Sequence, residues 1–225
     1  MKALKPMMAA AALLVCATAF HVVPAPAATA LVNQAIPDND PGGLSSQLMV
    51  SGQSGNVSNN LVVSLNINGA YDGDLYAFLT HGTGFAILLN RVGRTATDDL
   101  GYGDAGFNVA ITYDAAADIH DYGGNGGNLV VGTFQPDGRN VSPYDVLDTT
   151  PRTAMLSSFN GVDPNGAWTL FVADVSGGDL HELKSWSLQF QAVPEPGCSS
   201  LALVGGVGLV ALRLFRNRRS PASTP

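Results

Sequence analysis

Cysteine is almost absent from this chain of 225 residues. The two cysteines, Cys16 and Cys198, lie near the two ends, so residues 31–197 contain none. A cysteine nucleophile and a cysteine-ligated zinc site are therefore excluded for this central part. Disulfides are excluded there too, and a domain of this length can bury a sufficient core without them.

Basic residues are scarce in the same part of the chain. Residues 31–197 hold all 18 acidic residues but only five basic ones, which gives them a formal charge of −13. Such a charge repels a phosphate backbone and argues against nucleic acid as a partner. Cations and basic partners remain compatible with it.

A sustained helical period is also missing from the central part. Alternating or continuous apolar runs, typical of strands, are separated by turns rich in glycine, proline and aspartate. The runs cover residues 63–68, 75–79, 85–89, 107–113, 129–131, 168–173 and 186–190. Short strands at this spacing predict an all-β domain, an antiparallel β-sandwich or jelly roll, over residues 33–192.

The alternation also predicts the core. Most aromatic residues fall in core register, which disfavours an exposed aromatic stripe of the kind that binds glycans. Both tryptophans are expected inside, with a hydrogen-bond acceptor for each indole N–H. The predicted core comprises Leu65, Ile67, Leu79, Val109, Trp168, Leu170, Trp186 and Leu188.

The N-terminus has the pattern of a secretory signal peptide, residues 1–30. Lys2 and Lys5 precede an apolar run over residues 7–20, and small residues follow it. Cleavage is expected after Ala28 or Ala30. The chain is thus predicted to be exported.

The C-terminus combines three features in residues 193–219. Pro194, Glu195 and Pro196 come first, and an apolar run over residues 199–212 follows. This run is shorter than the roughly 20 residues that span a bilayer, but it lengthens to Phe215 if the Arg213 head reaches the interface. We therefore predict a transmembrane helix. A basic cluster then keeps the C-terminus, including the tail 220–225, in the cytoplasm. The cluster comprises Arg213, Arg216, Arg218 and Arg219.

This ordered triple resembles the PEP-CTERM sorting signal of bacteria that make extracellular polysaccharide. The resemblance implies an exosortase-type membrane protease as a partner, which would process the chain near Pro194–Pro196. It also implies a membrane-anchored intermediate that precedes a cell-surface or extracellular form.

The central part resembles a P/Homo B domain, the β-sandwich found beside subtilisin-like proprotein convertases. The resemblance rests on residues 36–39, 63–67, 71–75, 134–136, 159–161, 165–174, 178–179 and 183–188. Two positions depart from the family pattern. Gly69 stands where the family has histidine, and His181 stands where it has glycine.

No catalytic constellation is evident in the sequence. A Gly-x-Ser-x-Gly elbow is missing, and there is no room for the large catalytic domain of a subtilisin-like protease. The three central histidines, His81, His120 and His181, are expected in turns, without metal-ligand spacing. We therefore predict that the protein is not an enzyme.

Calcium is the one ion whose binding the sequence suggests. Hard carboxylate oxygens near predicted strand ends suit a cation that takes six to eight oxygen ligands. The candidates are Asp72, Asp74, Asp174 and Asp179. No EF-hand spacing accompanies them, and solvated turn aspartates are the alternative interpretation.

These features favour a non-catalytic, exported protein of the cell surface or extracellular matrix, associated with a biofilm or exopolysaccharide. Its expected partners are the exosortase-type protease, the membrane before processing, and extracellular polysaccharide. The alternative is a binding module for a glycan or protein, or an accessory domain of a subtilisin-like serine endopeptidase.

Overall fold

The computed structural model describes residues 28–190. This part of the chain forms nine strands and two short 3₁₀ helices, η1 and η2. The elements are β1 (Ala28–Ile36), β2 (Asp40–Val50), β3 (Leu61–Asn68), η1 (Asp72–Asp74), β4 (Leu75–His81), β5 (Gly84–Asn90), β6 (Gly106–Ile111), β7 (Val130–Phe134), η2 (Leu156–Phe159), β8 (Gly166–Asp174) and β9 (His181–Phe190).

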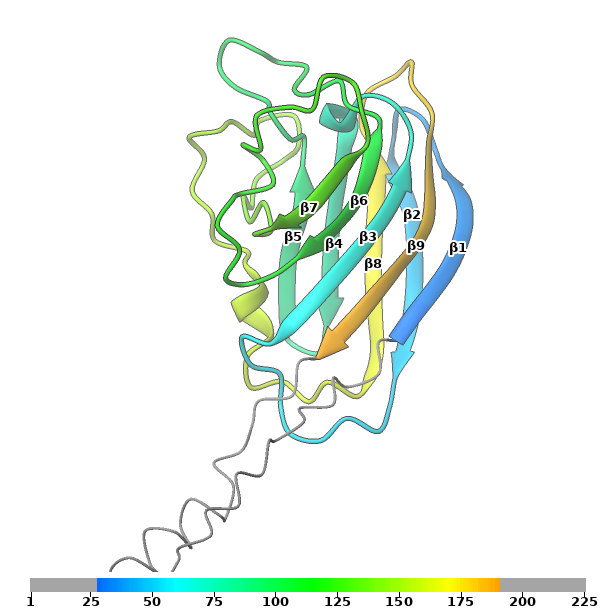
Figure 1. Ribbon diagram of the computed structural model, residues 1–225, viewed down its shortest axis with the longest axis vertical. Coiled ribbons are helices and arrows are strands. Elements are labelled where there is room, and N and C mark those ends of the chain that lie inside the picture. Colours follow the sequence, from blue (N-terminus) through cyan, green and yellow to red (C-terminus); the bar gives the residue numbers. More distant parts are fainter. Residues whose placement is uncertain (1–27, 191–225) are drawn as a thin grey trace, which may run out of the picture.

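The strands form two sheets that pack face to face, as predicted. Sheet A has the order β1-β9-β3-β6-β7, and sheet B has the order β2-β8-β4-β5. Figure 1 shows sheet A in front of sheet B. The prediction of a purely antiparallel sandwich was wrong in one respect, because β6 and β7 pair in parallel. The 18 residues between them make the crossover that a parallel pair requires.

Alternation of apolar and polar side chains explains why the strands form where they do. In β3, Val63, Leu65 and Ile67 are buried, whereas Ser64 and Asn66 between them are partly exposed. Because successive side chains of a strand point to opposite faces, this pattern directs one face inward and the other to solvent. The predicted strands therefore recur as β3 to β9, with shifted ends.

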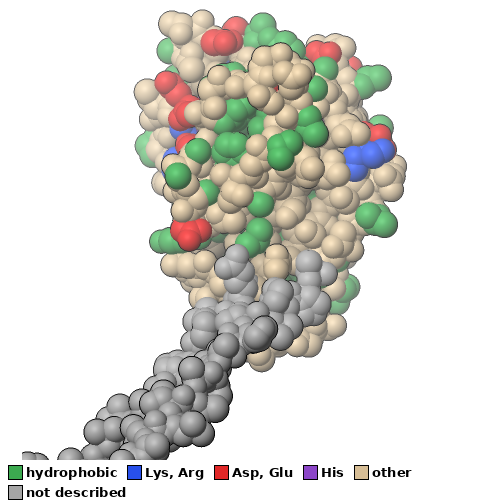
Figure 2. Space-filling model, viewed as in Figure 1, with side chains coloured by type: hydrophobic (Ala, Val, Ile, Leu, Met, Phe, Trp, Pro, Cys, Tyr) green, Lys and Arg blue, Asp and Glu red, His purple; other side chains and the backbone are tan. Residues whose placement is uncertain are grey.

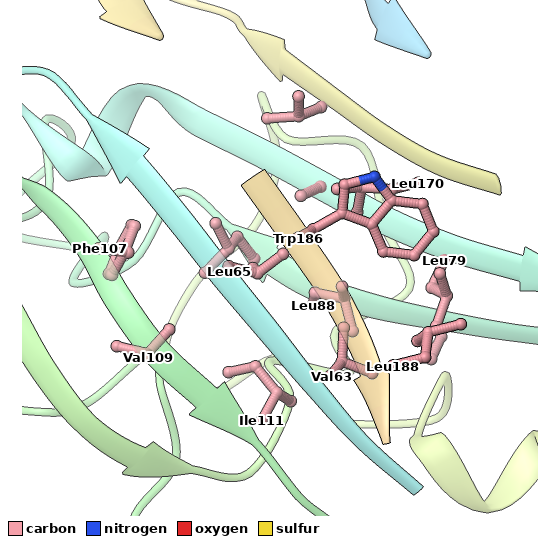
Figure 3. Close-up of a cluster of buried hydrophobic side chains, with 14 of the residues drawn as sticks. Val63, Leu65, Leu79, Leu88, Phe107, Val109, Ile111, Leu170, Trp186 and Leu188 are labelled. Carbon is pink, nitrogen blue, oxygen red and sulfur yellow. The ribbon is translucent and has the colours of Figure 1, made fainter. Parts of the chain in front are cut away.

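The core lies between the two sheets (Figure 3). All eight residues predicted to form it are buried. Both indole N–H groups also find the acceptors that burial demands: Trp168 donates to the Pro164 carbonyl at 2.8 Å and Trp186 to Ser46 Oγ at 2.9 Å. The second bond joins the sheets, since Trp186 lies in sheet A and Ser46 in sheet B.

Strand β1 was not expected from the sequence, since its first residues fall in the predicted signal peptide. Ala28 pairs with Leu188 of β9, and Ala30 pairs with Trp186. Both alanines, proposed above as cleavage sites, are half-buried against the core. The sandwich therefore begins five residues before the expected boundary at residue 33.

Within residues 28–190, no helix is long and apolar enough to cross a membrane. The predicted transmembrane segment lies outside the described residues. So do all the residues of the predicted sorting signal: Pro194, Glu195, Pro196, Arg213, Arg216, Arg218 and Arg219.

Candidate functional site

Buried charged side chains gather at the end of the sandwich that carries η1. Pairing of β4 with β8 puts Leu75 opposite Asp174, and the Val175 N–H donates to the Asp74 carbonyl at 2.9 Å. This register brings the carboxylates of Asp74 and Asp174 together. Arg91 approaches Asp74 Oδ1 at 3.8 Å and supplies the opposite charge.

His181 supplies a hydrogen-bonding partner for this pair. Its Nδ1 donates to Asp174 Oδ2 at 2.8 Å, and both side chains are fully buried. Burial raises the pKa values of Asp74 and Asp174, and the mutual repulsion of the two groups raises that of Asp74 further. The pair therefore forms a closed charge cluster rather than a set of free ligands.

The two departures from the P/Homo B pattern meet in this cluster. Gly69 packs directly against the His181 ring, and a Cβ at position 69 would collide with ring atom Cδ2. A histidine at 181 thus requires a residue without a side chain at 69. The two changes are sterically complementary.

Asp72 is buried separately, next to the loop that leads into β6. Its Oδ1 accepts the Gly106 N–H at 2.7 Å, whereas the buried Oδ2 has no hydrogen-bond partner among the described residues. Burial, together with repulsion from Asp104, raises the pKa of Asp72 to about 7. Near neutral pH this carboxyl group is therefore partly protonated.

Asp104 is hydrogen-bonded to the glycine-rich loop that lies beside it. Its two oxygens accept the Tyr122 hydroxyl and the backbone N–H groups of Asn125 and Gly127, each at 2.7 Å. These three hydrogen bonds use most of the acceptor capacity of a carboxylate, which has about four lone-pair sites. Its role here is to hold the loop in place.

The four calcium candidates are not brought together as a single site. Asp74 and Asp174 share the cluster with Arg91 and His181, and Asp72 lies against the β6 loop. Asp179 is half-buried in the turn before β9. Between residues 28 and 190 there is no group of three or more His, Cys, Asp or Glu side chains that could hold a metal ion. Calcium binding stays a prediction, without a geometric site.

All three histidines are buried, and only His120 lies in a turn as expected, whereas His81 ends β4 and His181 begins β9. His81 ends β4, and its Nδ1 and Nε2 lie 2.9 and 2.6 Å from the carbonyl oxygens of Ala167 and Asp163. The ring also stacks on Trp168, with 4.1 Å between centroids.

His120 belongs to a second buried network. Its Nδ1 donates to Asp137 at 2.7 Å, and its Nε2 lies 3.0 Å from the Arg94 carbonyl oxygen. Burial alone would lower the pKa of His120, but the hydrogen bond and charge of Asp137 outweigh it and raise the pKa. Arg139 continues the network to Asp118 and Asp121.

No hydroxyl group contacts the ring nitrogens of His120 or His181 among the described residues. In each His–Asp pair, backbone N–H groups also donate to the carboxylate. The donors to Asp137 are Asn90 and Arg139, and the donor to Asp174 is Ser176. A nucleophile activated by histidine would need such a contact. Each pair joins two segments of the chain through a buried hydrogen bond.

Four aromatic side chains lie on the outer face of sheet B, contrary to the expectation that the aromatics fall in the core. Tyr76, Phe78, Phe85 and Phe171 are each partly exposed. The rings of Phe78 and Phe171 stack at a centroid distance of 4.7 Å. Alternation in residues 75–81 could have revealed them, since Leu75, Ala77 and Leu79 point inward and the residues between them point outward.

Comparison with known proteins gives little beyond this description. No family model and no curated protein matches the chain. Among solved structures, the complex of the Aeromonas sobria serine protease with the chaperone ORF2 is similar over 75% of this chain and 26% of that chain, with 16% identity and a TM-score of 0.40. The same protease without the chaperone gives 15% identity and a TM-score of 0.39 over the same shares. The chain thus spans about a quarter of the length of the solved chains that it resembles.

Proposed function

We propose that this protein is a non-catalytic, exported component of the cell surface or extracellular matrix, released from the membrane by processing near Pro194–Pro196. The observation that carries the proposal is the ordered C-terminal triple of proline-bracketed carboxylate, apolar run and arginine cluster, opposite a secretory signal. The sandwich is the part of the chain that export and processing would deliver to the surface or matrix.

The arrangement of the sandwich is compatible with display at a surface. Ala28 and Phe190, the first and last described residues, lie at the same end of it (Figure 1). The carboxylates of Asp72, Asp74 and Asp174 lie at the opposite end. A chain tethered through its C-terminal segment would therefore hold this end of the sandwich away from the membrane.

Mass spectrometry of the mature protein from its native host tests the proposal. We expect a species that has lost most residues after about Pro196, recovered outside the cytoplasmic membrane. Replacement of Pro194 and Pro196 by alanine should keep the protein in the membrane fraction, because the extended segment offered to a protease is lost. A wild-type chain that ends at Pro225 and stays embedded would contradict the sorting proposal.

The absence of catalysis is tested separately. Purified protein should not hydrolyse peptide substrates, since within residues 28–190 no hydroxyl group contacts the imidazole of either His–Asp pair. Turnover that survives repurification, is blocked by a serine-directed inhibitor and disappears with one serine substitution would overturn this part.

A second candidate function is that of an accessory domain beside a separate subtilisin-like protease. It rests on the sequence resemblance, whose most distinctive residues, Trp168 and Trp186, fill the core of the sandwich. Under this alternative, a protease should co-purify with the protein from its native host at a fixed ratio. Under the favoured proposal, the protein should be recovered without one.

A further inference from the structure

The outer face of sheet B has a regular arrangement across three strands. Cross-strand pairing aligns Ser45, Phe171 and Phe78 in one row, on β2, β8 and β4 respectively. The next row along the strands consists of Gln47, Thr169 and Thr80. An aromatic row therefore runs beside a row of amide and hydroxyl groups.

The aromatic row extends into a cluster of four rings. Phe78 contacts Phe85 of β5 at 5.4 Å and Tyr76 at 5.9 Å between centroids, in addition to its stacking on Phe171. The rings hold one another in position and remain partly exposed. Clustered, partly exposed aromatic rings are unusual on a solvated sheet and typically mark a binding surface.

The polar row has free hydrogen-bonding capacity. The side chains of Gln47, Thr169 and Thr80 have no hydrogen-bond partner within residues 28–190. Gln47 is exposed, and the two threonines are partly exposed. One amide and two hydroxyl groups, each able to donate and accept, thus lie in a line beside the rings.

Charge is missing from these two rows, although the central part of the chain carries −13. That overall charge opposes the approach of an anionic polymer or of a second copy of the domain. An apolar protein segment would leave the free polar row without partners, at a cost in desolvation. A neutral ligand rich in hydroxyl groups meets neither obstacle.

We propose that the outer face of sheet B binds a neutral polysaccharide that lies across β2, β8 and β4. The apolar C–H groups of the sugar rings would contact the Phe78–Phe171 row, because the negative face of an aromatic ring attracts the positively polarised hydrogen of a C–H bond. The sugar hydroxyls would exchange hydrogen bonds with Gln47, Thr169 and Thr80. This inference names the ligand of the surface or matrix protein proposed above and rests on that proposal for its setting.

Co-sedimentation of the full-length protein, in mild detergent, with insoluble polysaccharides tests the inference. The probes are microcrystalline cellulose, insoluble β-1,3-glucan, mannan and the neutral exopolysaccharide of the native host. Phe78→Leu and Phe171→Leu retain apolar packing but remove the rings, and each should weaken binding about tenfold. Thr169→Val, which keeps the shape of the side chain, should weaken it several-fold.

Tyr113→Leu is the matched control, because Tyr113 is an exposed aromatic residue, 41% accessible, outside sheet B. It should bind within about twofold of the wild type. Thermal unfolding of each variant separates loss of binding from loss of fold. Failure of the wild type to bind any of the four polysaccharides, or binding by both phenylalanine variants that equals that of the wild type, would overturn the inference.

Two further outcomes would also overturn it. One is a preference for an anionic polymer such as alginate. The other is a concentration-dependent dimer that Phe78→Leu abolishes, which would assign the face to a second copy. The processing experiment is independent: a chain that is processed but does not bind refutes only this inference, and a chain that binds but stays intact refutes only the sorting proposal.

Discussion

Asp72 is a fully buried carboxyl group with one hydrogen-bonded and one unpartnered oxygen. Its pKa of about 7 in the folded protein lies above the ordinary value of 3.8, so the folded state binds this proton more tightly than the unfolded state. The stability that the protonated group contributes is present at low pH and is lost as pH rises from about 4 to about 7.

We therefore expect Asp72→Asn to stabilise the protein at pH 8 by up to about 4 kcal/mol relative to its effect at pH 4. Chemical denaturation at both pH values measures the difference. Asp163→Asn is the control of opposite sign, because hydrogen bonds from Asn165 lower the pKa of Asp163 and its contribution is lost as pH falls. A difference in stability between Asp72→Asn and the wild type that is the same at pH 4 and pH 8 would contradict the raised pKa of Asp72.

Gly69 and His181 give a second prediction at the residue scale. Gly69→His should destabilise the domain by several kcal/mol, because its side chain would overlap the buried imidazole. The double variant Gly69→His/His181→Gly should recover most of that loss, since one histidine then occupies the space. A double-mutant cycle measured by urea denaturation isolates the coupling. Additive effects of the two single changes would show that the positions are independent.

At the scale of the elements, β8 places one of the two tryptophans in the core. Trp168 is fully buried, packs on Phe159 and Phe190, and donates to Pro164. Trp168→Ala should cost about 3–5 kcal/mol of unfolding free energy. Trp168→Phe should cost less, because it keeps much of the volume and loses mainly the hydrogen bond. Equal losses in the two variants would mean that packing volume is not the dominant contribution.

Strand β1 bears on where the signal peptide ends. Cleavage after Ala28 or Ala30 would remove residues that pair with β9. Ala25 and Ala27 are also small residues at the right spacing, and a cut between Ala27 and Ala28 leaves β1 whole. We therefore expect N-terminal sequencing of the exported protein to begin at Ala28. A mature chain that begins at Leu31 would mean that β1 is shorter in the exported form.

The alternation of apolar and polar residues was sufficient to predict the strands that have one buried and one exposed face. β3, β6 and β9 alternate, and their core residues followed directly. β4 and β8 were interpreted as continuously apolar, and this concealed the outward rings of Tyr76, Phe78 and Phe171. Those rings are as hydrophobic as core residues, so hydropathy alone cannot distinguish the two faces.

The charge cluster could not be inferred from sequence spacing. Asp74 and Arg91 lie far from Asp174 and His181 in the chain, and the two pairs meet only because β4 pairs with β8 and β9 returns to the same end. The parallel pairing of β6 with β7 was hidden for the same reason, since strand direction depends on a long loop without regular structure. The aspartates were identified correctly as strand-end residues, but their partners were not.

At the scale of the whole molecule, charge is distributed unevenly. In the view of Figure 2, which faces sheet A, acidic and basic side chains lie at the margins and the middle of the face is free of them. Two rows explain this: Ser187, Ser64 and Ala110 in one, and Ser185, Asn66 and Asn108 in the other. Within residues 28–190, the acidic residues other than Asp40, Asp174 and Glu182 lie outside the strands, and their net charge favours solubility.

The position of β9 also determines how the protein would carry mechanical load. β9 is the last described strand and lies between β1 and β3, antiparallel to both. A pull on Phe190 acts along the strand axis, whereas the hydrogen bonds to both neighbours run across it. Extracting the strand would have to break these two ladders almost together, in shear. A sandwich held through this strand should therefore resist tension far better than one that can be unzipped a bond at a time.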